Sequence, residues 1–91
     1  MWPQPPRLDG RLLTRQEANL LVIELNGLPS GSEGGNTAAL VKRATSEKTE
    51  LPLTPSQAAT LRRAVEGIRL KRRRLPPGLS QLRTRLQAAG T

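Results

Sequence analysis

The 91-residue sequence has no cysteine, histidine, tyrosine or phenylalanine, and Trp2 is its only aromatic residue. Without cysteine the chain can form no disulfide and no zinc site based on thiolates, and without histidine it lacks the commonest general base. The remaining Asp, Glu, Ser, Thr and Lys residues show no spacing typical of a nucleophile elbow or of paired metal-binding carboxylates. We therefore expect a protein that is not an enzyme and that needs no metal or cofactor.

Long apolar runs are also missing. No run approaches the roughly 18 residues that a membrane span requires. The first residues, Met1-Trp2-Pro3-Gln4-Pro5-Pro6, lack the basic start and apolar centre of a signal peptide. We expect no membrane association and a cytoplasmic location, with the nucleoid as the site if the protein binds DNA.

Branched and aromatic apolar residues are scarce as well. Only 21 of the 91 residues are Leu, Ile, Val or Phe, and 16 of those are leucine. Leucine favours packed helices, whereas a β-sandwich or barrel needs more Val, Ile, Tyr and Phe. We predict an all-α fold, a small bundle of about four helices in one domain. Because the core is small, stability should be modest and a homodimer is possible.

Proline is concentrated at the N-terminal end of the chain. Residues 1–11 are rich in proline and show neither a helical nor a strand period, which predicts a flexible N-terminal arm. The rest, residues 12–91, is expected to form the single helical domain.

Two capping boxes mark the start of the two longest predicted helices. In Thr14-Arg15-Gln16-Glu17 and Thr54-Pro55-Ser56-Gln57, a threonine can cap the helix while the residue three positions later reaches back. The first helix should end near Asn26-Gly27 and the other near Arg73, before Pro76 and Pro77. Each has apolar residues at helical spacing, namely Ala18, Leu21, Val22, Leu25 and Leu28 in the first and Ala58, Leu61, Ala64, Val65 and Ile68 in the other.

The apolar segment 20–25 leaves one alternative open. Leu20 and Ile23 lie off the main apolar face of the first helix, so that helix is expected to bury two sides. The same segment could also be a strand, although it has only two β-branched residues.

Two shorter helices are predicted after glycine and proline segments. Residues 29–35 look like a flexible hinge; they lack the lysine of a phosphate-binding loop and include Glu33. Asn36 or Thr37 can cap a helix that runs to about Ser46. Ser80, preceded by Leu79 as an apolar staple, can cap a last helix over 81–89.

The sequence repeats itself at a shift of 40 residues. Leu13-Thr14 aligns with Leu53-Thr54, and the similarity continues to Leu28 and Ile68. This pattern predicts two related helical hairpins, at about 13–50 and 53–90, each a long helix followed by a short one, which bury their apolar faces against each other. Similar capping signals alone could also produce the match.

Charge is distributed very unevenly. The net charge is +8, but residues 1–35 sum to −1 and residues 36–91 to +9. Arginine outnumbers lysine 12 to 3, which suits bidentate phosphate contacts and is also typical of GC-rich genomes. That bias is the one hint of a bacterial or phage source.

The segment 69–74 has five basic residues in six. Arg72 would project within the apolar stripe of its helix, so we expect the helix to have passed the end of the bundle by then, leaving a basic end in solvent. One or two cations would complement the helix dipole, and five exceed that need. The predicted phosphate-contacting residues are Arg62, Arg63, Arg69, Lys71, Arg72, Arg73, Arg74, Arg83 and Arg85.

Composition and charge together favour a small basic accessory or regulatory protein that binds DNA or RNA through phosphates. Because no aromatic platform is available for base stacking, recognition should depend weakly on sequence. The alternative is a protein-interaction module, such as a phage-type inhibitor or assembly factor, that docks on an acidic or apolar partner surface. A solvated helix end with no binding role also remains open.

Overall fold

The computed structural model describes residues 7–28 and 32–89, and the prediction of an all-α fold is confirmed. Segment 20–25, the possible strand, lies inside a helix. The elements in order are β1 (Arg7–Asp9), the 3-10 helix η1 (Gly10–Leu12), α1 (Arg15–Gly27), α2 (Ser32–Glu47), β2 (Glu50–Pro52), α3 (Pro55–Lys71) and α4 (Pro77–Ala89).

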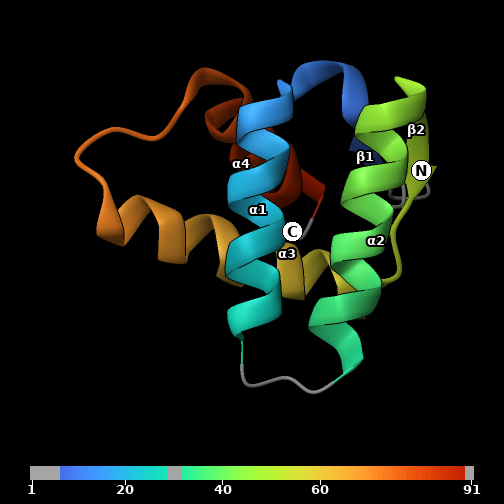
Figure 1. Cartoon of the computed structure of the whole chain (residues 1–91), viewed down its shortest axis with the longest axis horizontal. Coiled ribbons are helices and arrows are strands. Elements are labelled where there is room, and N and C mark those ends of the chain that lie inside the picture. The colour runs from blue at the N-terminus through green and yellow to red at the C-terminus, as the bar shows by residue number, and fades with distance from the viewer. Residues whose placement is uncertain (1–6, 29–31, 90–91) are drawn as a thin grey trace.

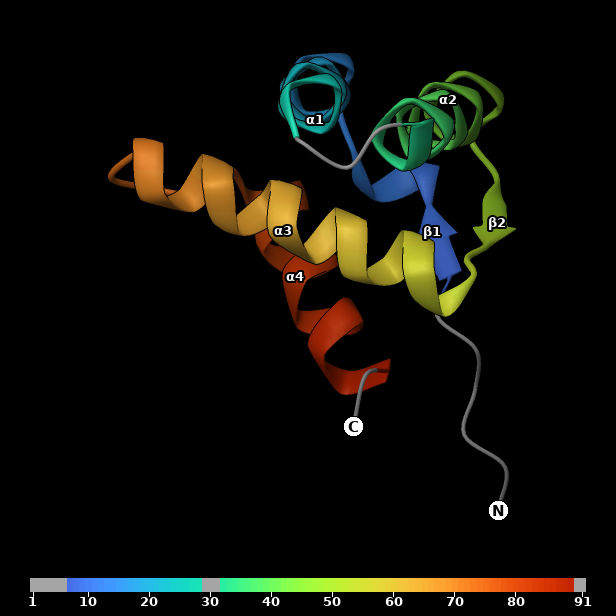
Figure 2. The same ribbon diagram turned by 90° about the horizontal axis from the view of Figure 1, so that it is seen from below.

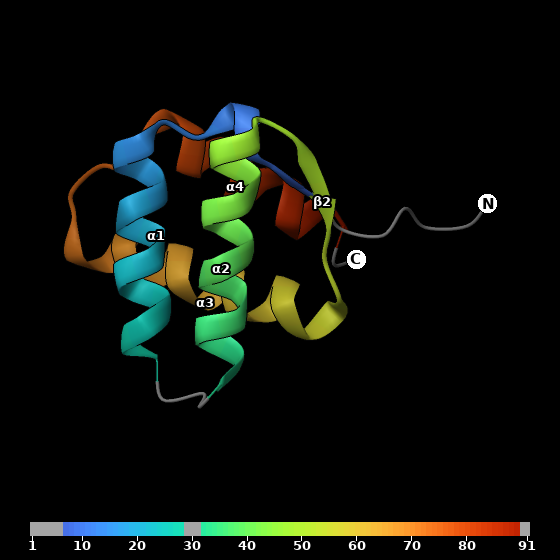
Figure 3. The same ribbon diagram turned by 45° about the vertical axis from the view of Figure 1, so that its right-hand side comes forward.

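The other three helices pack in layers on the two sides of α3. Helices α1 and α2 lie side by side, and α3 crosses behind both of them (Figures 1 and 3). Helix α4 packs on the opposite side of α3 and also contacts β1 and η1 (Figure 2). The core lies where these layers meet, and Leu21, Leu61 and Val65 are fully buried there.

Both predicted capping boxes are confirmed. The Thr14 hydroxyl accepts a hydrogen bond from the Glu17 N–H at 3.2 Å, and the Glu17 carboxylate accepts one from the Thr14 N–H at 2.9 Å. Thr54 and Gln57 make the same pair of bonds at 3.1 and 3.0 Å. The local sequence is therefore sufficient to fix where α1 and α3 begin.

The predicted arm at 1–11 is wrong over its second half. Arg7–Asp9 form β1, which pairs antiparallel with β2 so that Leu8 faces Leu51, and Leu8 is fully buried. The Gly10 N–H donates to the Thr49 carbonyl at 3.0 Å. This pairing depends on a partner more than 40 residues away, which no local period reveals. Residues 1–6 lie outside the described part of the chain.

Helix α2 begins at Ser32, four residues before the predicted cap at Asn36, so part of the predicted hinge is helical. Gly34 is buried, and Thr37 is fully buried with its hydroxyl donating to the Glu33 carbonyl at 2.8 Å. Thr37 is thus a core residue rather than a cap. Packing of α2 along α1 and α3 outweighs the low helix propensity of its glycines.

Helix α4 also begins earlier than predicted, at Pro77 instead of residue 81. The Gly78 N–H in its first turn donates to the buried Glu17 carboxylate at 2.7 Å. This carboxylate caps the N-terminus of α4, which is the role predicted for Ser80, although Glu17 lies 61 residues away from Gly78 in the sequence. Leu79 is accordingly fully buried within the helix and not a staple before it.

Three further predictions about the helices need correction. Helix α3 ends at Lys71, two residues before the predicted Arg73. Helix α2, with 16 residues, is longer than α1, with 13, so the first hairpin is not a long helix followed by a short one. Ile23 is 69% exposed, so α1 does not bury a second side there. The duplication of the hairpin stays a prediction.

Candidate functional site

The nine cations predicted to contact phosphates divide into two groups. Four of them form ion pairs with carboxylates, and five have no carboxylate within 4 Å among the described residues. The paired cations are Arg69, Lys71, Arg83 and Arg85; the unpaired ones are Arg62, Arg63, Arg72, Arg73 and Arg74.

Glu66 on α3 holds two of the paired cations. Its carboxylate accepts a hydrogen bond from Arg83 on α4 at 2.5 Å and another from Arg69 at 3.4 Å. The hydrogen bond from Arg83 lowers the pKa of Glu66 below its ordinary value, and the charges of Arg83 and Arg69 act in the same direction. The Arg83–Glu66 pair therefore helps to join α3 to α4, whereas the Arg69–Glu66 pair lies within α3.

Lys71, the last residue of α3, is tied to α1. Its ammonium donates to both oxygens of the Glu24 carboxylate, at 2.9 and 3.1 Å. Glu24 lies directly against Gly67, so a side chain at that glycine would collide with the carboxylate. Lys71 is thus an exposed cation that is already paired with a carboxylate across the α1–α3 contact.

Arg85 on α4 lies 4.0 Å from the buried carboxylate of Asp9. Asp9 also accepts three hydrogen bonds from Arg11, at 3.0, 3.0 and 3.1 Å. The side-chain hydrogen bond from Arg11 lowers the pKa of Asp9, and burial opposes that effect. Arg85 is therefore held partly by an internal carboxylate.

Arg72, Arg73 and Arg74 form what we call the arginine loop. Arg72 caps the C-terminus of α3 in an extended conformation, and all three arginines are exposed. The end of α3 and the segment that follows it project beyond α1 (Figures 1 and 2). The expectation that the helix passes the bundle before Arg72 and leaves a basic end in solvent is confirmed.

The exposed side of α3 leads into this loop. Arg63 and Leu70 are seven residues apart and so share one helix face; both are exposed, and Leu70 is 80% exposed. Arg62 is half-buried on the neighbouring face. At 1.5 Å per residue, Arg62 lies about 15 Å along the helix axis from Arg72.

Five of the nine predicted cations are guanidinium groups with no carboxylate partner in the part of the chain that the structure describes. No three His, Cys, Asp or Glu side chains there come close enough to hold a metal ion. None of the described helices is both long and apolar enough to cross a membrane. Guanidinium groups of this kind can form bidentate hydrogen bonds with phosphate or carboxylate oxygens.

The carboxylates that neutralise four of the nine cations were not predicted from the sequence. The Arg69–Glu66 spacing of three residues was a detectable signal, because residues three apart on a helix are neighbours. The Lys71–Glu24 and Arg85–Asp9 contacts join distant segments and had no local signal.

Comparison with models of known protein families, with curated proteins and with solved structures finds no match to this chain.

Proposed function

We propose that the protein binds DNA or RNA by contacting phosphate groups with the arginine loop, assisted by Arg63 and Arg62. The observation that supports this most strongly is that Arg72, Arg73 and Arg74 are consecutive, exposed and without a carboxylate partner in the described chain. Three adjacent like charges oppose folding by mutual repulsion, and a single cation would satisfy the helix terminus. An external polyanion would remove that repulsion.

The shape of this region suits a backbone contact. The loop projects from the molecule, so it can reach the surface of a duplex without a complementary cleft (Figure 2). Arginine forms bidentate hydrogen bonds with phosphate oxygens, which fix position without reporting base sequence. We therefore expect binding with little sequence preference, as in an accessory or regulatory factor.

The proposal predicts how steeply the binding affinity falls with salt concentration. If the five unpaired arginines each contact one phosphate, the slope of log K against log salt should be about −4.5. Affinity should then fall about 500-fold between ~50 and ~200 mM salt, because each contact releases a condensed counterion.

The test is fluorescence anisotropy of a labelled generic duplex at those two salt concentrations. The variant R72Q/R73Q/R74Q should lose only about 10-fold in affinity between them, because about two contacts remain. The control is R15Q/K42Q/K48Q, which removes the same charge from unpaired cations elsewhere and should respond to salt as the wild type does. Absence of binding at low salt would overturn the proposal, and equal loss in both variants would remove the arginine loop as its site.

A second candidate function rests on Leu70. This side chain is 80% exposed and lies between Arg69 and Lys71, so an apolar residue and several cations occupy one end of α3. Such a surface would suit docking on an acidic or apolar protein partner. Apolar docking would respond little to salt, and L70S would weaken it, whereas the same substitution should leave duplex binding unchanged.

A further inference from the structure

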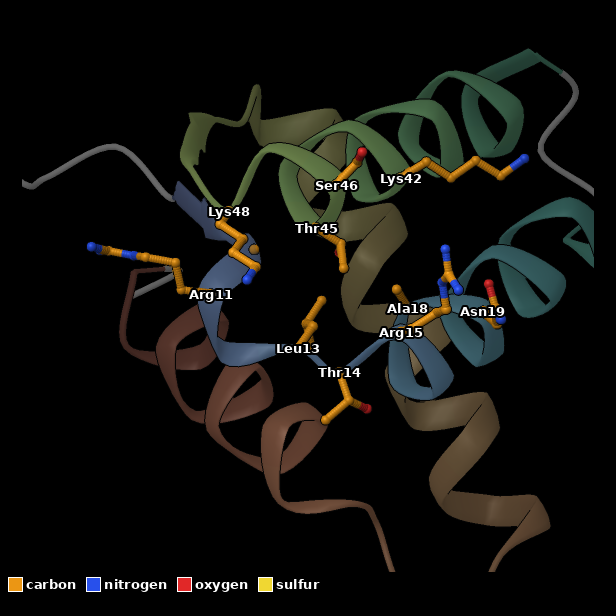
Figure 4. Close-up of a pocket in the computed structure, with 11 residues that line it drawn as sticks. Arg11, Leu13, Thr14, Arg15, Ala18, Asn19, Lys42, Thr45, Ser46 and Lys48 are labelled. Carbon is orange, nitrogen blue, oxygen red and sulfur yellow. The ribbon is translucent and has the colours of Figure 1, made fainter.

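A groove opens between the start of α1 and the end of α2, on a different part of the molecule from the arginine loop. Its volume is about 700 Å³, within the range of small-molecule sites. The lining comes from η1 and the link to α1, the first turns of α1, the C-terminal part of α2 and Lys48, which follows α2 (Figure 4).

The groove is strongly cationic. Arg15, Lys42 and Lys48 line it, and none of them has a carboxylate within 4 Å in the described ranges 7–28 and 32–89. Arg11, which pairs with Asp9, also contributes to the lining, but its side chain points away (Figure 4). No carboxylate side chain is among the described residues that line the groove. A concave surface lined with positive charges attracts small anions.

A buried hydroxyl adds a second, independent signal. Thr45 lines the groove, and its Oγ1 atom is buried without a hydrogen-bond partner among the described residues. Buried polar atoms in proteins are nearly always paired, so an unpaired one calls for a partner from outside. On the α1 side, the Asn19 side chain lies beside Arg15 and offers a further donor (Figure 4).

Lys48 supplies a third signal, in the backbone. It follows α2 with a φ of 50°, in the left-handed region that favours glycine. The Thr49 N–H closes the helix end by donating to the Ala44 carbonyl at 3.1 Å, an arrangement in which glycine is the usual residue at position 48. A lysine at a position that favours glycine, on the rim of a cationic groove, points to a use for its side chain.

We infer that this groove binds a small molecule with a phosphate dianion: the Thr45 hydroxyl donates to it, and the charges of Arg15, Lys42 and Lys48, which lie along the groove (Figure 4), attract it. The concave form suits a compact ligand, whereas the projecting arginine loop suits a polymer. This inference does not rest on the proposed nucleic-acid function, because it uses different residues.

The experiment is isothermal titration calorimetry with inorganic phosphate, adenosine monophosphate and, as the uncharged control, adenosine. The wild type should bind both phosphate compounds saturably and adenosine not at all. Tighter binding of adenosine monophosphate would identify the ligand as a phosphorylated organic molecule, and equal affinity would identify free phosphate.

Two variants separate binding from folding. T45V removes the unpaired hydroxyl at nearly constant shape, and K48G relieves the strained backbone, so neither should lower the melting temperature. Each should nevertheless weaken phosphate binding about tenfold or more, because hydrogen bonds and ion pairs to a charged group are lost. The charge-reduced variant R72Q/R73Q/R74Q should bind phosphate as the wild type does.

Failure to detect saturable binding of either phosphate compound would overturn the inference. So would unchanged affinity in both T45V and K48G, or an equal loss in R72Q/R73Q/R74Q. Duplex binding by R15Q/K42Q/K48Q is measured in parallel. Failure of the proposed phosphate binding by the groove and failure of the proposed duplex binding by the arginine loop are then detected with different variants.

Discussion

The two halves of the chain begin alike and differ in how they use charge. Each half has a three-residue strand, a Leu-Thr pair at the helix entry and then two helices. Leu13 and Leu53 are both buried, and both threonines form complete capping boxes. The two halves differ in charge, because the acidic residues lie mostly in the first half and the cations mostly in the second.

Carboxylates of the first half reach across to the second. Glu17 accepts from the Gly78 N–H, Glu24 binds Lys71, and Asp9 lies near Arg85. The charge excess of the second half is therefore partly neutralised inside the fold. The arginine loop differs because no such carboxylate reaches it in the described chain. This lack of a carboxylate partner, rather than net charge, is the reason why we propose the loop as the site for a polyanion.

The largest expected effect concerns Glu17 and its counterpart Gln57. Both complete a capping box, but Glu17 is buried and also bonds to Gly78 on α4. E17A should lower the free energy of unfolding by about 3 kcal/mol, because it leaves buried donors unpaired. Q57A should cost about 0.5–1 kcal/mol, since its bonds are exposed. Urea unfolding monitored by circular dichroism measures both, and equal losses would show that the link to α4 adds nothing.

A comparison on α3 separates its buried face from its exposed one. Leu61 is fully buried, so L61A should cost about 3 kcal/mol through lost burial and a cavity. Leu70 is 80% exposed, and L70A should change stability by less than about 0.5 kcal/mol. The same unfolding measurement decides, and a large loss for L70A would mean that this residue is covered, for example in a dimer.

Acid should weaken the fold through Asp9. Because the pKa of Asp9 is lowered in the folded protein, the unfolded chain binds this proton more readily. The stability it contributes is present above its ordinary pKa of 3.8 and is lost as pH falls through the lower folded value. Urea midpoints measured between about pH 6 and pH 2 should therefore fall less steeply in D9N than in the wild type. Parallel curves would contradict the prediction.

Local signals in the sequence predicted the fold class and the starts of α1 and α3, because a capping box involves residues only three apart. They did not predict β1, the start of α4 or the helical part of the hinge. In each case the deciding contact is distant: Leu8 pairs with β2, and Gly78 bonds to Glu17. The glycine-rich start of α2 is helical because it packs on other helices.

Some features of the candidate site were likewise predictable from the sequence, and others were not. The exposure of Arg72, Arg73 and Arg74 was predictable from the helical period, which placed a charge where the core would otherwise continue. The pairing of Lys71 with Glu24 was not, since it needs α1 and α3 to be placed in space first. The groove residues Arg15, Lys42 and Thr45 come from two helices, and only the fold brings them together.

The most direct test of the account compares unpaired with paired arginines. The slope of log K against log salt is measured for duplex binding by the wild type, by R72Q/R73Q/R74Q and by R43Q/R69Q/R83Q, whose arginines each contact a glutamate. The account predicts that the first variant flattens the slope by about 2.7, and that the second changes it by less than about 1. Equal changes in the two variants would contradict it, because net charge alone would then govern binding.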